Sequence, residues 1–536
     1  MTATRAGRAG GASGLILTAA IALGACGGPA ARPAGNPASI EVTYESAPKA
    51  PGRAEAKAAL LPTYWRDRKD LIQSPPPPQA AELTLPKVDR WKMRNGLEVV
   101  VVARPDLPVV SFSMAIKAGG YDEEKASTLG VSSFTVSMLR KGTRTRSADA
   151  IARAIDFVGG TLDTQSGSES SGASCAALSR DSALCLDLLS DILLRPTFPE
   201  AEFPEVRDQM MAALNSRYDN PSELASEHFD NLLFGEKHPD GWVLTPDDVQ
   251  KITQQQLVVF WKTFFRPNNA ILAVAGDVDP VRLRVELEKA FGGWERAEVP
   301  ERPVFKVPDV KMTRVLLVDR PDLTQSTLIF GHRGIKHIDP AWYAVTLMNY
   351  VLGGSDFSSR LMTEVRAKRA LTYGIGSSFG ASLYEGAFRV QASTKNASVW
   401  DALTASVAEI RRMKSDGPTP LELSKAKGFY AGSYPFNLQT ADGVAANIVA
   451  ADLHGLGLPY VRQFPLRMAG VTLKDARDAA ATFLNPDNLW VVIVGRGAEV
   501  EPQIAKAGLP YERIDFKSPV SYAARAKARK AAKPAP

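Results

Sequence analysis

Histidine and cysteine are scarce in this sequence. Its 536 residues include five histidines and three cysteines. No two histidines stand in the pattern His-x-x-Glu-His or its inverse, which binds zinc through two imidazoles on one helix face. A zinc site of that kind is therefore excluded. We expect surface or hydrogen-bonded side chains throughout the set, with one on a surface helix (His228) and one in a turn (His238); the others are His332, His337 and His454.

Long apolar runs are missing as well. The run Leu15–Leu23 follows a basic start and is too short to cross a bilayer, so it predicts a secretory signal. Its end, Leu23-Gly24-Ala25-Cys26, resembles a bacterial lipobox and predicts lipidation of Cys26; an ordinary signal peptide cleaved at a small residue is the alternative. Gly27 is not the aspartate of inner-membrane retention. We expect a lipid-anchored protein of the bacterial cell envelope, facing the periplasm and held in the outer membrane.

The other two cysteines, Cys175 and Cys185, lie in apolar surroundings ten positions apart. An exported chain permits a disulfide between them. Two buried thiols fit the same surroundings equally well, so the sequence leaves both states open.

Acidic residues are absent from both ends of the chain. Residues 1–25 carry two arginines, and residues 517–536 carry six basic side chains. The formal charge of +6 therefore belongs to the ends, and the body is close to neutral. A nucleic-acid-binding protein carries its basic residues on the fold itself. We expect no nucleic-acid partner.

An internal repeat organises the chain. Arg104-Pro105-Asp106-Leu107 recurs as Arg320-Pro321-Asp322-Leu323, 216 positions later, and Pro267-Asn268-Asn269 recurs as Pro486-Asp487-Asn488. Two matches at nearly one period predict two copies of a module. We assign 1–26 to the signal and lipidated cysteine, 27–85 to a Pro/Ala-rich tether, 86–297 to the first module, 298–311 to a linker, 312–516 to the second module and 517–536 to a basic tail.

Each copy begins with strands and continues with amphipathic helices. The β-branched run Leu97–Ala103 predicts a buried strand, with Val109–Ala118 as its neighbour. Thr197–Asn220 and Trp400–Ser415 have helical periodicity. The pattern predicts an α+β fold in which each homologous module is an antiparallel or mixed sheet packed with helices.

The stretch Leu129–Thr143 predicts a helix that Gly142 ends. Its frame resembles the zinc-site helix of the pitrilysin/insulinase (M16) family of metallopeptidases, and this frame consists of Gly130, Phe134, Met138, Leu139 and Lys141-Gly142-Thr143. The family is built from paired modules, so the resemblance implies the two-module α+β fold.

The same alignment implies that the zinc site has been lost. It places the two family histidines on Ser133 and Ser137 and the catalytic glutamate on Val136. The third family ligand, a glutamate on a later helix, falls at Ala212 or Ala213. Serine is a poor zinc ligand and valine accepts no proton, so we expect no cofactor in this chain.

The second module resembles another family segment. Leu361–Leu371 predicts a helix leading into Thr372-Tyr373-Gly374, and it is similar to Leu-Arg-Glu-Lys-Arg-Gly-Leu-Ala-Tyr. The resemblance implies that Arg366 holds substrate carbonyls and that Tyr373 stabilises an oxyanion. Without it, a charged helix face and a packed tyrosine would explain both residues. The preceding Gly353-Gly354 lies where non-catalytic family subunits have a glycine-rich loop, and we expect a turn there.

A zinc-site helix without its ligand residues, combined with a retained Arg/Tyr pair, matches the non-catalytic subunits of two-chain family members. We expect no autonomous activity. The resemblance implies a heterodimer with a zinc-bearing homologue, in which Arg366 and Tyr373 act in trans on peptides bound as an added strand. The alternative is a non-enzymatic peptide-binding or scaffold lipoprotein of the cell envelope.

Overall fold

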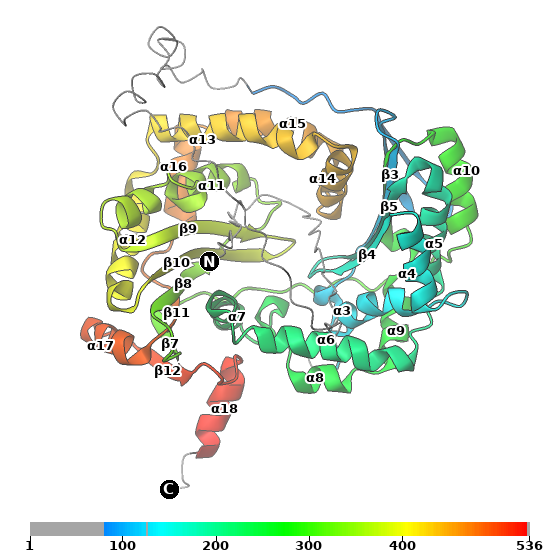
Figure 1. The fold of residues 1–536 in the computed structure, drawn as a ribbon. Coiled ribbons are helices and arrows are strands. Elements are labelled where there is room, and N and C mark those ends of the chain that lie inside the picture. The colour runs from blue at the N-terminus through cyan, green and yellow to red at the C-terminus, as the bar shows by residue number, and fades with distance from the viewer. Residues whose placement is uncertain (1–79, 125–126, 533–536) are drawn as a thin grey trace, which may run out of the picture. The chain divides into compact units, whose positions relative to one another are not determined.

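The computed structural model describes residues 80–124 and 127–532, which form two six-stranded sheets packed with helices (Figure 1). The predicted α+β class is confirmed. Cys26 and the tether up to residue 79 lie outside the described residues.

In the first sheet the order is β1-β2-β6-β3-β5-β4: Val88–Lys92, Glu98–Ala103, Ala270–Gly276, Val109–Ile116, Ser171–Leu178 and Thr161–Ser166. In the second the order is β12-β7-β11-β8-β10-β9: Tyr511–Asp515, Arg314–Asp319, Trp490–Gly495, Gln325–Arg333, Glu385–Lys395 and Thr372–Ala381.

Five strands of each sheet repeat in order and direction. Within this five-strand repeat, the strand that comes first in sequence runs parallel to the one that comes last, β2 to β6 and β7 to β11. The remaining pairs, β6–β3–β5–β4 and β11–β8–β10–β9, are antiparallel. The sixth strand differs, because β1 pairs antiparallel with β2 whereas β12 pairs parallel with β7. The sequence repeat thus corresponds to a repeat of five strands.

Helices account for most of the remaining described chain. Those before residue 300 are α3 (Val131–Met138), α4 (Ala148–Phe157), α5 (Ser182–Leu194), α6 (Phe203–Ser216), α7 (Pro221–Phe234), α8 (Pro246–Lys251), α9 (Gln254–Phe264) and α10 (Pro280–Phe291). Those after it are α11 (Trp342–Asn349), α12 (Val399–Asp416), α13 (Pro420–Ser433), α14 (Ala441–Leu453), α15 (Gly457–Gly470), α16 (Leu473–Phe483), α17 (Gly497–Ala507) and α18 (Tyr522–Ala532). Two segments are π-helical, η8 (Tyr350–Gly354) and η9 (Met362–Ala367).

Three sequence expectations need correction in detail. The helix expected over Thr197–Asn220 begins only at Phe203, because Pro199 and a positive φ at Phe198 interrupt the backbone before it. The turn expected at Gly353-Gly354 is the end of the π-helix η8. The helix expected over Leu361–Leu371 is shorter and π-helical, since η9 ends at Ala367.

One helix of each module packs on the sheet of the other module (Figure 1). Helix α7 of the first module packs on β8 and β11, where Leu224 and Phe229 share a buried cluster with Ile329. Helix α14 of the second module packs on β2 and β6, and its Ile448 shares a cluster with Val100. Because each sheet is covered by a helix from the other half, the core of neither module is complete without its neighbour.

The repeated Arg-Pro-Asp-Leu motif holds these exchanged helices. Arg104 donates to the carbonyl of Gln439, one residue before the N-cap of α14, at 3.0 Å. Arg320 donates in the same way to the carbonyl of Tyr218, two residues before the N-cap of α7. Each arginine also pairs with the aspartate of its own motif. The repeat therefore marks a pair of inter-module contacts.

The segment between the modules and the start of the C-terminal tail are packed against the fold. Arg302 binds the Asp122 carboxylate at 2.6 Å and the Glu169 carbonyl at 2.8 Å. In the tail, Val520 is buried beside α7. Arg525 is buried too, donating to the Pro519 carbonyl at 2.8 Å.

Cys175 on β5 and Cys185 on α5 form a disulfide, with a Cα–Cα distance of 5.7 Å. Of the two states that the sequence left open, the structure has the bridge. Among the described helices, none alone has the length and hydropathy to span a membrane; the pair α14–α15 meets both criteria only together, across a bend of 104°.

Candidate functional site

Helix α3 keeps its frame because the frame residues are core residues. Phe134, Met138 and Leu139 are fully buried. Gly130 takes a φ of 86° at the N-cap, a conformation that glycine adopts without strain. The buried Glu123 carboxylate accepts from the Gly130 amide at 2.9 Å and from the Ser132 amide at 2.6 Å, satisfying two N–H groups that a helix start leaves open. These two hydrogen bonds fix the start of the helix.

The positions of the family ligands offer nothing to a metal. Ser133 and Ser137 are exposed, and the Ser137 hydroxyl donates to the Ser133 carbonyl at 2.9 Å. Val136 is buried in the first-module core. Ala212 lies exposed on α6, which packs against α3. A catalytic zinc needs three protein ligands and a water position, and this set of side chains does not fit one.

No other metal-binding cluster is found in the part of the chain that the structure describes. Over residues 80–124 and 127–532, no three histidine, cysteine, aspartate or glutamate side chains gather as metal ligands do. His228 is fully buried on α7, 3.5 Å from Arg525, and does not lie at the surface as expected. Burial lowers the pKa of His228 to about 3. His454 instead pairs with Glu169 of the first module at 2.7 Å.

Arg366 and Tyr373 are brought together on the second module. Arg366 lies on η9, and Tyr373 lies at the start of β9, where its side chain is 78% exposed. The guanidinium carbon of Arg366 is 5.1 Å from the centre of the Tyr373 ring. It is also 4.7 Å from the centre of the Phe357 ring, on the opposite flank in sequence. Both distances are within the range of a cation–π interaction.

Phe357 was missed by sequence reasoning. It stands nine positions before Arg366, a spacing that no regular α-helix brings into contact. Its side chain is 65% exposed, so neither burial pattern nor helical periodicity marks it. The contact arises because the chain turns between the π-helices η8 and η9. The only available signal was an apolar residue beside the family-like segment.

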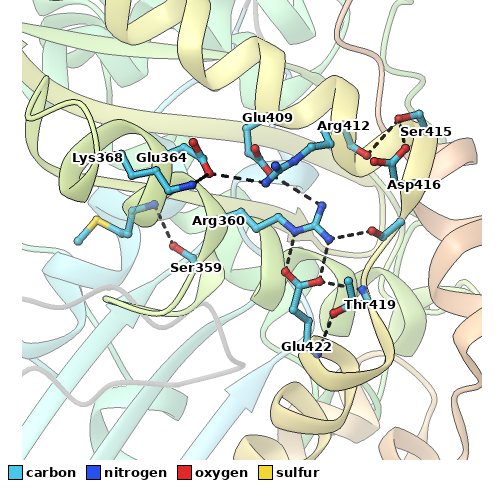
Figure 2. Close-up of polar contacts among 12 residues, drawn as sticks. Ser359, Arg360, Glu364, Lys368, Glu409, Arg412, Ser415, Asp416, Thr419 and Glu422 are labelled. Atoms are coloured by element: carbon cyan, nitrogen blue, oxygen red, sulfur yellow. Dashed lines mark hydrogen bonds and ion pairs between the residues drawn. The ribbon is translucent and has the colours of Figure 1, made fainter.

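An ion-pair network around the buried Arg360 side chain holds η9 (Figure 2). Arg360, just before η9, is buried and binds both carboxylate oxygens of Glu422 on α13, at 2.8 and 2.7 Å. It also donates to the Gly417 carbonyl at 2.9 Å. Within η9, Glu364 bonds Lys368 at 2.6 Å and lies 3.8 Å from Arg412 on α12. The hydrogen bonds from Arg360 lower the pKa of Glu422 to about 2.

The network leaves the Arg366 guanidinium free for a ligand. Within the described residues, the Arg366 side chain makes no hydrogen bond or ion pair, and the acid two residues away, Glu364, is already paired. Its positive charge and five donors are oriented by rings alone. Planar guanidinium donors bind carbonyl or carboxylate oxygens.

Both parts of the site lie at sheet edges. Strand β4 is the edge of the first sheet and contacts α3. Strand β9, which begins with Tyr373, is the edge of the second sheet. An edge strand presents backbone donors and acceptors that an extended peptide can pair with. The fold therefore offers two edges beside the residues singled out by the sequence.

These features define a class of protein: a two-module α+β chain in which the ligand positions predicted on α3 hold serine and valine and the second module presents an arginine–tyrosine pair. Comparison with known families agrees. The model described as insulinase (peptidase family M16) matches residues 98–246, and the model described as peptidase M16 inactive domain matches residues 251–429. The chain belongs to the M16 (insulinase) family of peptidases, as the frame of α3 predicts.

Relatives carry peptidase names. An uncharacterized zinc protease of Streptomyces coelicolor is 28% identical over 403 residues, covering 74% of this chain and 87% of the relative. One of Bacillus subtilis is 26% identical over 361 residues, covering 66% and 85%. A crystal structure of a peptidase M16 inactive domain from Pseudomonas fluorescens has a TM-score of 0.71 and 26% identity, covering 76% of this chain and 98% of that one. A Helicobacter pylori protease with 21% identity and a TM-score of 0.70, covering 77% and 100%, shares the fold.

Proposed function

We propose that this chain is the catalytically inactive subunit of a heteromeric zinc peptidase. A zinc-bearing M16 homologue would supply the metal site, and this chain would supply Arg366 and Tyr373 in trans. One observation carries the proposal. Every predicted ligand position around α3 holds a side chain that does not fit zinc, while Tyr373 is exposed and the half-buried Arg366 has no polar partner for its guanidinium.

The two residues would have separate roles. The Arg366 guanidinium would donate to peptide carbonyls in the bound substrate as well as during the reaction, which lowers KM. The Tyr373 hydroxyl would donate to the oxygen that becomes negative during peptide-bond cleavage. A donor aimed at a developing oxyanion is worth about 10²–10³ in kcat. Substrates would be peptides or unfolded segments, bound as an added strand at a sheet edge.

The proposed site of action is the bacterial cell envelope. The lipobox-like sequence ending at Cys26 supports a lipid anchor on the periplasmic side, with the outer membrane favoured. Cys26→Ala should release the chain from the membrane or leave it unprocessed. If the variant fractionates with membranes as the wild type does, another part of the chain or a partner holds it there, and the lipobox interpretation is wrong.

Reconstitution with the zinc-bearing homologue from the same organism tests the central proposal. Wild type, Tyr373→Phe and Arg366→Ala are each combined with the partner and assayed on one fluorogenic peptide. Tyr373→Phe should reduce kcat by about 10²–10³, and Arg366→Ala should mainly raise KM. Tyr511→Phe is the matched control, since Tyr511 lies on β12 at the opposite edge of the same sheet.

Two results would overturn the proposal. If both site variants retain full activity while associating normally with the partner, the pair does not act in trans, and the scaffold function becomes the better account. If the isolated chain holds one tightly bound zinc that is lost on Ser133→Ala or Ser137→Ala, the alignment of α3 is wrong. Metal analysis of the purified chain, expected to find less than stoichiometric zinc, decides the second point.

A further inference from the structure

We propose that Phe357 is a positioning and specificity-determining residue of the Arg366–Tyr373 site, and that it selects peptides with a bulky apolar or aromatic side chain beside the carbonyl held by Arg366. The inference rests on the proposed function and adds a substrate preference to it. The starting observation is the contact of the Arg366 guanidinium carbon with the Phe357 ring, 4.7 Å from the ring centre, on a side chain that is 65% exposed.

Phe357 is held by its neighbours although it is exposed. The amide of Ser355 donates to the Tyr350 carbonyl at 3.1 Å, and the hydroxyls of Ser355 and Ser358 lie 3.1 Å apart. On the other side, Ser359 and Arg360 are buried, and Arg360 is tied to Glu422 (Figure 2). A large apolar side chain on a fixed backbone is thus presented outward, where it adds little to the core.

The Phe357 ring orients the Arg366 guanidinium. Since the Arg366 guanidinium has no hydrogen bond or ion pair within the described residues, its direction depends on its contacts with the Phe357 and Tyr373 rings. A carboxylate in the place of Phe357 would fix the arginine as firmly but would neutralise it. An aromatic face fixes a guanidinium while leaving its edge donors open. Removing the ring should therefore weaken peptide binding through Arg366.

The exposed parts of the rings also set the chemistry of the neighbouring substrate side chain. A peptide carbonyl that accepts from Arg366 brings the adjacent side chain against Phe357 and Tyr373. Burying apolar surface there is favourable, and an aromatic side chain gains most because it covers the largest area. A lysine or arginine is disfavoured, since it meets the charge of Arg366 at short range. The preferred substrates are peptides with aromatic or large aliphatic residues at that position.

The test compares two peptides that differ only at this position, phenylalanine against serine. Wild type, Phe357→Ala, Phe357→Leu and Phe357→Tyr are measured in the reconstituted complex. Phe357→Ala should raise KM for the phenylalanine peptide about five- to tenfold and for the serine peptide about twofold, with kcat little changed. Phe357→Tyr should restore both values. Phe357→Leu should keep part of the apolar preference and lose the orientation of Arg366.

A double variant distinguishes the orientation of Arg366 by Phe357 from the simple loss of the apolar surface of Phe357. In the Arg366→Ala background, Phe357→Ala should have a smaller effect on the KM of the serine peptide than in the wild type. Phe157→Ala is the matched control, because Phe157 is 90% exposed at the end of α4 in the first module and should change neither peptide. Equal KM values for the two peptides in the wild-type complex, or an unchanged ratio in Phe357→Ala, would overturn the inference.

Binding of the same two fluorescent peptides to the isolated chain, measured by anisotropy, distinguishes this inference from the proposed function. If the complex is inactive but the isolated chain prefers the phenylalanine peptide and loses that preference in Phe357→Ala, the trans-acting role fails and the specificity role stands. If the complex is active and depends on Tyr373 while neither assay shows a preference, the proposed function stands and the role of Phe357 is refuted.

Discussion

The ion pair between Glu422 and Arg360 gives a sharp prediction about stability. Glu422→Gln keeps the side-chain size and can still cap α13, where Glu422 accepts from the Thr419 amide at 2.8 Å. It removes the charge that neutralises the buried Arg360 guanidinium. Breaking a buried pair costs about 3–5 kcal/mol, because the remaining charge is left without its partner.

The expected loss is at the low end of that range or below it. The Glu422 side chain is 31% exposed, and Arg360 keeps the Gly417 carbonyl and the Glu409 carboxylate at 3.7 Å. We expect Glu422→Gln to lower the free energy of unfolding by about 2 kcal/mol at pH 7. Urea unfolding followed by circular dichroism measures it, and hydrogen exchange should rise first in η9, since Arg360 joins that segment to α13.

The pH dependence of the same variant has a defined sign. Hydrogen bonds from Arg360 lower the pKa of Glu422 from 4.5 to about 2 in the folded protein. A lowered carboxyl pKa stabilises the fold above the unfolded value and loses that contribution as the pH falls toward the folded value. The difference between wild type and Glu422→Gln should therefore be full above about pH 5 and shrink between pH 4.5 and 2.

An exposed pair provides the control. Arg411 and Asp487 also meet at 2.8 Å, but their side chains are 59% and 66% exposed. Asp487→Asn should change the free energy of unfolding by less than about 0.5 kcal/mol. If Glu422→Gln costs no more than Asp487→Asn, or if its deficit does not depend on pH, then the network does not anchor η9 as argued.

Three further predictions concern the backbone, the disulfide and the exchanged helices. Ala370 has a φ of 52° where the similar family segment has glycine, so Ala370→Gly should raise the free energy of unfolding by up to about 1 kcal/mol. Ala367→Gly in η9 should lower it by a similar amount. Thermal unfolding compares the two variants, and a change of the same sign in both would contradict the role of the positive φ. Changing Cys175 and Cys185 together to Ala should cost about 2.5 kcal/mol for a loop of this length, measured by calorimetry, and a loss below about 0.5 kcal/mol would show that the bridge adds little. Arg320→Ala should speed hydrogen exchange in α7 and cost about 1–2 kcal/mol, while unchanged exchange there would refute its role in holding that helix.

Local patterns in the sequence were sufficient for much of the fold and for part of the site. The frame of α3 was predictable because Phe134 and Met138 recur at the period of one helix face, and burial of that face follows directly. The repeated Arg-Pro-Asp-Leu motif indicated two modules, because a motif that recurs at one period along the chain indicates a repeated structural unit. The resemblance to the family identified the ligand positions, and residue chemistry then sufficed, since no packing turns Ser133 or Val136 into a zinc ligand.

The tertiary structure alone decided how these parts are joined and oriented. Nothing near Arg320 in the sequence indicates that it binds the chain before α7, 102 positions earlier, because the exchange of helices depends on which sheet face each module leaves open. The segment that leads into η9 is tied to α13 by the pairing of Arg360 with Glu422, 62 positions away. That pairing and the turn after η8 bring Phe357 onto Arg366, so the aromatic half of the candidate site exists only in the folded chain.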